Sequence, residues 1–149
     1  MKQKLLLYFI FALLIFIVDH STKTLIKLYV HPLEVIRILP FFNIVYVENT
    51  GSAFGLFKSL GNTFFIIISI FAITLVSFLL VKEKDNRLCY SLIIGGAAGN
   101  LVDRIIYGYV IDFFDFHIAG VHWPVFNIAD SALTIGIILL FYKTLFKKS

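Results

Sequence analysis

The stretch TFFIIISIFAITLVSFLLV, which runs from Thr63 to Val81, contains no charged residue. A helix needs about 20 predominantly apolar residues to cross the hydrocarbon core of a bilayer, and this stretch meets that requirement almost unaided. Three more apolar runs occur in the chain, and each reaches that length only by including polar residues at one end. We therefore predict a single integral-membrane domain, residues 1–149, with four transmembrane helices at about 5–28, 62–82, 88–107 and 128–146.

The composition agrees with a membrane protein. Hydrophobic residues make up 60% of the chain, charged residues 15%, and the mean hydropathy is +0.94. A soluble domain has roughly 45–50% apolar and about 25% charged residues. The net charge of +4 does not indicate a nucleic-acid partner, because the basic residues gather at the ends of the apolar runs instead of forming a stripe.

The basic residues set the orientation of the helices. In a four-span arrangement most of them fall on one side, at the two termini and in the loop after the second run: Lys2, Lys4, Lys82, Lys84, Arg87, Lys143, Lys147 and Lys148. The positive-inside rule makes that side cytoplasmic. Every polar interruption of a span lies at its other end, so we expect any site to face outward.

The first predicted span carries a pair of charged residues at its outer end. Asp19 and Lys23 are four residues apart, on one helix face, with the acid first. We interpret them as an ion pair near the interface, with Lys23 reaching the lipid head groups; a role in anchoring polar groups around an outer site is the alternative.

The segment GGAAGNLVDR combines two signals. Gly95 and Gly99 have the spacing that lets helices pack closely in lipid. Asn100, Asp103 and Arg104 then form one polar face, which fits either an interfacial cluster that fixes the depth of the helix or a functional site.

Three aspartates occur between residues 110 and 131. Asp112 has apolar neighbours on both sides, so we expect it to be partly desolvated with a raised pKa. We place Asp112 in an outer loop before the fourth span, and we interpret Asp115 as a solvated acid of that loop. Asn127 is a candidate N-cap of the fourth helix, and Asp130, at the start of an apolar run, is a candidate functional acid.

Two carboxylates held close together share a proton, so one can take a proton from water while the other donates one. This chemistry is that of an aspartyl hydrolase, and it needs no metal and no cofactor. The four histidines match no common zinc spacing, and neither a GxSxG elbow nor a glycine-rich phosphate loop occurs. The alternative is a membrane transport or ion-relay subunit that uses the outer carboxylates.

Five motifs together resemble the bacterial lipoprotein signal peptidase (signal peptidase II) family of membrane aspartyl proteases. They are DHSTK (19–23), VENTGSAFG (47–55), GGAAGNLVDR (95–104), VIDFFDFH (110–117) and WPVFNIADS (123–131). The resemblance implies a mainly α-helical membrane protein with a small extracytoplasmic β-sheet cradle and a short surface helix. The residues VIRILPFFNIVYVEN (35–49) suit one or two strands, and the amphipathic stretch after Gly51 suits a surface helix.

The resemblance also implies the site and the substrate. The catalytic pair maps to Asp112 and Asp130, with Asp103 as the rival for the first position. Substrate-binding or supporting roles map to Asn49, Gly51, Asn100, Asp103, Arg104, Asn127, Asp19 and Lys23. The implied partners are diacylglyceryl-modified prolipoproteins and membrane lipid. We expect a monomer in the bacterial cytoplasmic membrane, with cytoplasmic termini and an extracytoplasmic site.

Overall fold

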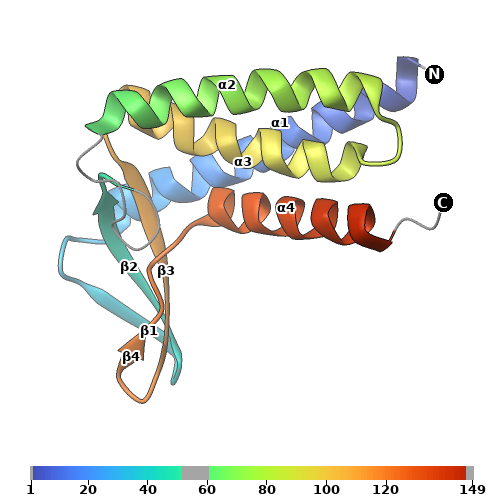
Figure 1. Cartoon of the computed structure of the whole chain (residues 1–149). Coiled ribbons are helices and arrows are strands. Elements are labelled where there is room, and N and C mark those ends of the chain that lie inside the picture. The colour runs from blue at the N-terminus through green and yellow to red at the C-terminus, as the bar shows by residue number, and fades with distance from the viewer. Residues whose placement is uncertain (1, 52–60, 147–149) are drawn as a thin grey trace.

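Four helices lie side by side, and a small antiparallel sheet stands at one end of them (Figure 1). The structure is a computed structural model that describes residues 2–51 and 61–146. The helices are α1 (Lys2–Tyr29), α2 (Gly61–Lys82), α3 (Arg87–Ile106) and α4 (Ile128–Phe146). The start of α1 and the end of α4 lie at the end of the bundle opposite the sheet (Figure 1).

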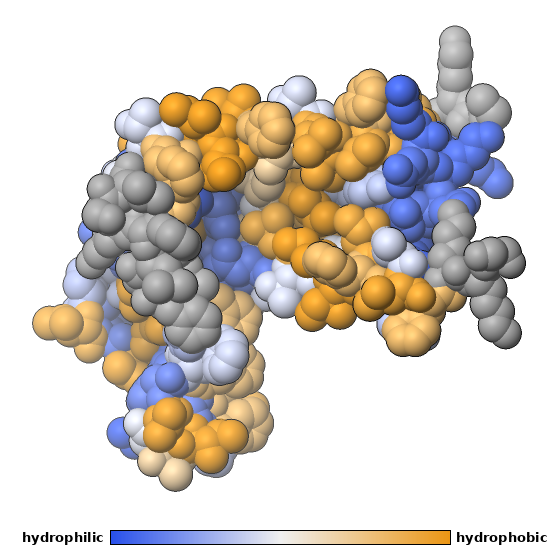
Figure 2. Space-filling model, viewed as in Figure 1, coloured by the Kyte–Doolittle hydropathy of each residue, from blue (hydrophilic) through white to orange (hydrophobic). Residues whose placement is uncertain are grey.

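Three of these helices are long and apolar enough to cross a membrane, namely α1 from Lys4, α2 and α4. Hydrophobic residues cover much of the helix flanks seen in Figure 2. The third predicted span coincides with α3, but α3 is not among the three apolar candidates. Its composition has a structural reason: its glycines and polar residues are buried against the other helices instead of facing outward.

Close helix packing depends on the glycines of α3. A Cβ atom added to Gly95 would lie 2.6 Å from the Ala12 carbonyl oxygen of α1, and one added to Gly96 would overlap the Ala129 carbonyl oxygen of α4. The predicted packing role of Gly95 and Gly99 is confirmed, because a Cβ on Gly99 would also overlap the Asp19 carboxylate of α1.

The sheet has the strand order β1-β2-β3-β4, and all neighbours are antiparallel. Its strands are β1 (Val35–Leu39), β2 (Phe42–Asn49), β3 (Val110–Ile118) and β4 (Val121–His122). The prediction of one or two strands within 35–49 is confirmed, and the segment forms two, β1 and β2. The expected short surface helix would fall in 52–60, outside the described residues.

One sequence prediction about this region is wrong. We expected Asp112 and Asp115 to lie in an outer loop, but both lie on β3, which pairs with β2. The register sets Asp112 opposite Val47 and Asp115 opposite Asn43.

Candidate active site

Asn127 begins the fourth helix and links two acids. As predicted, it caps the helix: its Oδ1 accepts a hydrogen bond from the backbone N–H of Asp130 at 2.8 Å. Asp130 Oδ2 accepts one in return from the Asn127 backbone N–H at 3.3 Å. The Asn127 side-chain amide also donates to Asp112 Oδ1 at 2.6 Å. One fully buried asparagine therefore holds the carboxyl groups of Asp112 and Asp130 in a fixed relation.

Asp112 is only 1% exposed on β3. Its second oxygen, Oδ2, accepts a hydrogen bond from the Asn49 side-chain amide at 2.8 Å. Burial and then the nearby charge of Asp130 raise the pKa of Asp112 from 3.8 to about 7, although the amides of Asn49 and Asn127 favour its ionised form. The expected desolvation of Asp112 is confirmed, and at neutral pH this carboxyl group both holds and releases a proton readily.

Asn100 connects Asp130 to a buried cation. Its side-chain amide donates to Asp130 Oδ1 at 2.7 Å, while its Oδ1 accepts from Lys23 Nζ at 2.8 Å. Because Asn100 and Lys23 come from α3 and α1, this pair of hydrogen bonds joins three helices around the acids.

Lys23 lies between two further carboxylates. Its Nζ atom is 2.8 Å from Asp19 Oδ2 and 3.0 Å from Asp103 Oδ2. The predicted Asp19–Lys23 ion pair is confirmed, but the interpretation that Lys23 reaches the lipid head groups is wrong, because the side chain is 1% exposed. Two buried acids attract the ammonium group inward, and burying it without them would be costly.

Asp19 and Asp103 also position backbone. Asp19 Oδ1 accepts from the Ala129 N–H in the first turn of α4 at 2.8 Å. Asp103 Oδ2 accepts from the Ile111 N–H at 3.2 Å, immediately before Asp112 in the chain. Each acid therefore fixes the backbone next to one member of the Asp112–Asp130 pair.

Arg104 connects this network to the end of β2 and to α2. Its guanidinium donates to the Gly51 carbonyl oxygen at 3.2 Å and lies 5.0 Å from the Phe65 ring centroid. Gly51 closes a turn after β2, since its N–H donates to Asn49 Oδ1 at 2.9 Å. The contacts of Phe65, and the hydrogen bond from Asn62 to the Arg104 carbonyl oxygen, were not foreseen, because nothing in the sequence near them marks a site.

A cleft of about 670 Å³ opens beside these residues. Its polar lining includes Asn49, Gly51, Asn100, Arg104 and Asp130. Its apolar lining includes residues of α2 and α4, among them Phe65, Ile68, Leu133 and Ile135. The cleft therefore combines a polar end with a wall made by two helices that are apolar enough to face lipid.

The structure brings together all ten residues that the sequence proposed for the site, through the contacts above. Asp115 is separate, and its interpretation as a solvated loop acid is wrong: it is 5% exposed and accepts a hydrogen bond from Asn43 at 2.8 Å. Burial tends to raise its pKa, but the hydrogen bonds with Asn43 and His122 outweigh that effect and lower the pKa of Asp115. Among the described residues, no cluster of three or more histidine, cysteine or acidic side chains is arranged to hold a metal ion.

A sequence model described as signal peptidase (SPase) II matches residues 11–146. The chain belongs to the signal peptidase II family. The lipoprotein signal peptidase of Thermodesulfovibrio yellowstonii is 50% identical to it, over 99% of this chain and all of that protein. The lipoprotein signal peptidase of Francisella tularensis subsp. novicida is 43% identical over 95% of this chain and 92% of its own length.

Solved structures agree with the fold. Two structures described as a bacterial membrane enzyme superpose with TM-scores of 0.86 and 0.84, each with 35% sequence identity. They cover 93% and 95% of this chain, and the chain covers 87% and 94% of them. Membership of the signal peptidase II family makes this chain a membrane-bound peptidase.

Proposed function

We propose that the protein hydrolyses the peptide bond before the diacylglyceryl-modified cysteine of prolipoproteins, with a water molecule activated by Asp112 and Asp130. The names of its relatives support the substrate class. The observation that carries the mechanism is the bridging position of Asn127, which is hydrogen-bonded to both acids. Aspartyl proteases use two carboxyl groups that share one proton in this way.

The reaction follows from the protonation of the pair. The ionised carboxyl group takes a proton from water as the water oxygen attacks the scissile carbonyl carbon, and the protonated one donates toward the carbonyl oxygen. Collapse of the tetrahedral intermediate breaks the C–N bond, and the leaving amine takes up a proton. The raised pKa of Asp112 supports the sharing of a proton near neutral pH. The two acids titrate as a pair.

Asn49 has a specific part in this proposal. It lines the cleft and donates to Asp112 Oδ2, while Asp112 itself is almost completely buried. A substrate that brings its scissile bond to Asp112 displaces this amide, which then binds the substrate backbone. Gly51 and Arg104 lie next to Asn49 and are placed to bind the same segment of substrate.

The remaining residues act as support. Asp103 is occupied by Lys23 and by the Ile111 N–H, which favours a structural role over a catalytic one. Asp19, Lys23 and Asn100 hold α1, α3 and α4 in register at the acids. Asn127 orients the pair.

We also propose that the chain is a single domain whose four helices all cross the membrane. α3 has 20 residues, or about 30 Å of helix, which equals the hydrocarbon thickness. Because α3 packs against all three apolar helices, we infer that it crosses the membrane with them as a fourth span. The basic residues at the opposite end from the sheet then place the termini in the cytoplasm and the site outside.

Cleavage of a purified precursor tests the function. The intact protein in detergent or vesicles is incubated with a diacylglyceryl-modified precursor and with the same precursor unmodified, and the released signal peptide is measured. We expect cleavage of the modified form and a loss of at least about 10²-fold in rate for Asp112→Asn and Asp130→Asn. Cleavage of neither precursor by the wild-type protein would defeat the proposal.

Asp103→Asn serves as the rival variant, because it changes a third buried acid in the same network. It is expected to keep more activity than either dyad variant. If Asp112→Asn stayed active while Asp103→Asn did not, Asp103 would replace Asp112 in the pair. The ion-relay alternative has no such support, since the described acids of the network lie at one end of the bundle and α2 has its only charge at Lys82.

A further inference from the structure

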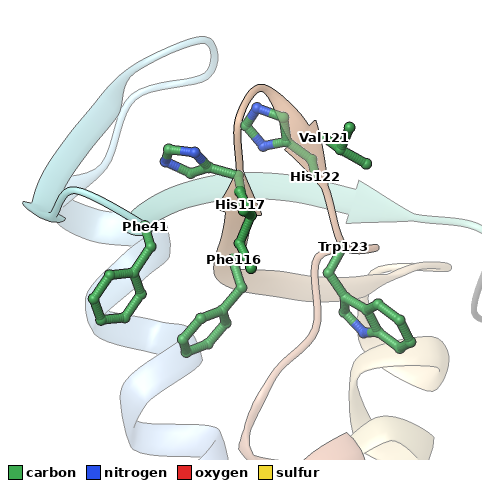
Figure 3. Close-up of a pocket in the computed structure, with 7 residues that line it drawn as sticks. Phe41, Phe116, His117, Val121, His122 and Trp123 are labelled. Atoms are coloured by element: carbon green, nitrogen blue, oxygen red, sulfur yellow. The ribbon is translucent and has the colours of Figure 1, made fainter.

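Three aromatic rings project from one side of the end of the sheet. Phe41 follows β1, Phe116 lies on β3 and Trp123 follows β4. All three point toward the side on which the helices extend (Figure 3). Trp123 is 61% exposed, Phe41 48% and Phe116 39%, and together with their neighbours they line an open hollow of about 440 Å³. This is a large amount of aromatic surface to leave in water.

Two histidines also line this hollow, but their rings point the other way. His117 and His122 point away from the helices in Figure 3 and stack on each other, with ring centroids 4.9 Å apart. His122 Nδ1 also lies 2.6 Å from Asp115 Oδ1. The aromatic rings at the end of the sheet therefore point toward the helices, while the two histidine rings point away from them.

The aromatic side continues onto the helix bundle. Trp123 lines both this hollow and the larger cleft, where it is joined by Leu133 and Ile135 of α4. α4 is one of the three helices suited to cross a membrane, and Ile135 is 51% exposed on it. An apolar surface thus extends from the flank of a membrane-spanning helix to the rings under the sheet.

We propose that Phe41, Phe116 and Trp123 form a membrane-seating surface, which inserts into the outer leaflet beside the helix bundle. This proposal rests on the proposed function, in which the four helices cross the membrane and the sheet lies outside. Lipid is the occupant that the geometry favours, because the rings point along the helices and adjoin a lipid-facing flank, and because tryptophan concentrates at membrane–water interfaces. Since Phe116 and Asp112 share β3, the seated rings fix the height of Asp112 above the bilayer.

The chain contains a single tryptophan, so Trp123 reports on this surface without any mutation. The full-length protein is reconstituted into vesicles whose lipids carry bromine at the head-group end of the acyl chains, and its fluorescence is compared with that in unbrominated vesicles. Acrylamide in the water is the second quencher. We expect bromine to remove most of the Trp123 emission and acrylamide to remove little. Strong quenching by acrylamide with none by bromine would overturn the proposal.

Two variants test the other rings. Phe41→Ser is expected to make Trp123 more accessible to acrylamide and less accessible to bromine, because the surface loses one of its three anchors. Leu33→Ser is the matched control, since Leu33 is 99% exposed but does not line the hollow. Equal effects of both substitutions, or of neither, would contradict the assigned surface.

Other occupants give different results, and each would refute a lipid seat. A second copy of the chain would make Trp123 resistant to both quenchers only at high protein-to-lipid ratios. A substrate-binding role would protect Trp123 only after a precursor is added. The measurement uses no substrate and no cleavage, so its failure leaves the peptidase proposal standing, and inactive dyad variants leave this proposal standing.

Discussion

Replacing Asp112, a buried acid that lies next to Asp130, should stabilise the protein while it abolishes catalysis. Asp112→Asn removes a carboxyl group whose pKa is raised from 3.8 to about 7 by burial and by Asp130. In the unfolded chain the same group ionises near its ordinary value. Between these two pKa values the folded protein binds the extra proton, so the free energy of unfolding falls as the pH rises.

The magnitude follows from the shift. A change from 3.8 to about 7 in the pKa of Asp112 corresponds to about 4 kcal/mol of stability, present below about pH 4 and lost by about pH 7. The asparagine that replaces it has no charge to lose. The new asparagine has only one side-chain oxygen, so its NH2 group faces the donating amide of either Asn49 or Asn127. The lost hydrogen bond costs about 1 kcal/mol at every pH. The variant is therefore expected to gain about 4 kcal/mol relative to the wild type between about pH 4 and pH 8.

Unfolding of both proteins in the same detergent, followed by circular dichroism against added denaturing detergent at a series of pH values, measures this difference. Ser131→Ala is the matched control: it removes a hydroxyl that donates to the Asn127 carbonyl oxygen and no titratable group, so its difference from the wild type should not depend on pH. A pH-independent difference between Asp112→Asn and the wild type would refute the reasoning, because it would mean that Asp112 is not a desolvated acid.

Two further variants and a pH profile test the same network. Lys23→Met is expected to cost about 3–5 kcal/mol of unfolding free energy, because it leaves Asp19 and Asp103 buried without their cation. Its control is Lys27→Met, which removes only an exposed contact over the Tyr107 ring and should cost about 1 kcal/mol or less in the same detergent titration. Gly99→Ala is expected to lower the free energy of unfolding by about 1–3 kcal/mol and to slow precursor cleavage, since its Cβ would overlap the Asp19 carboxylate. A fully stable, fully active variant would show that the helices do not pack this closely. The kcat/KM for precursor cleavage is expected to fall as the pH rises above about 7, because Asp112 then loses the shared proton; a pH profile that is flat through this range would contradict the assignment.

The helices were predictable because hydropathy and length determine them locally. Each predicted span matches a helix to within a few residues, including α3, whose glycine spacing also indicated its packing. The Asn127 cap was predictable for the same reason, since its partner, Asp130, is only three residues away.

The environment of a polar residue was harder to predict, because it depends on segments that are distant in the chain. Lys23 is buried because Asp103, eighty residues later, approaches it from another helix. Asp115 is buried because the strand register brings it to Asn43. Neither contact has a local signal, so Lys23, near the end of a span, and Asp115, in an expected loop, were interpreted as exposed.

The central claim is that Asp112 and Asp130 act as one unit, and the double variant tests it most directly. Initial cleavage rates are measured for Asp112→Asn, Asp130→Asn and the protein with both substitutions, on the same diacylglyceryl-modified precursor. Groups that act as a unit are strongly non-additive, so the double variant should be no slower than the slower single variant. Losses that multiply, or a single variant that cleaves at the wild-type rate, would show that the two acids do not share the catalytic proton.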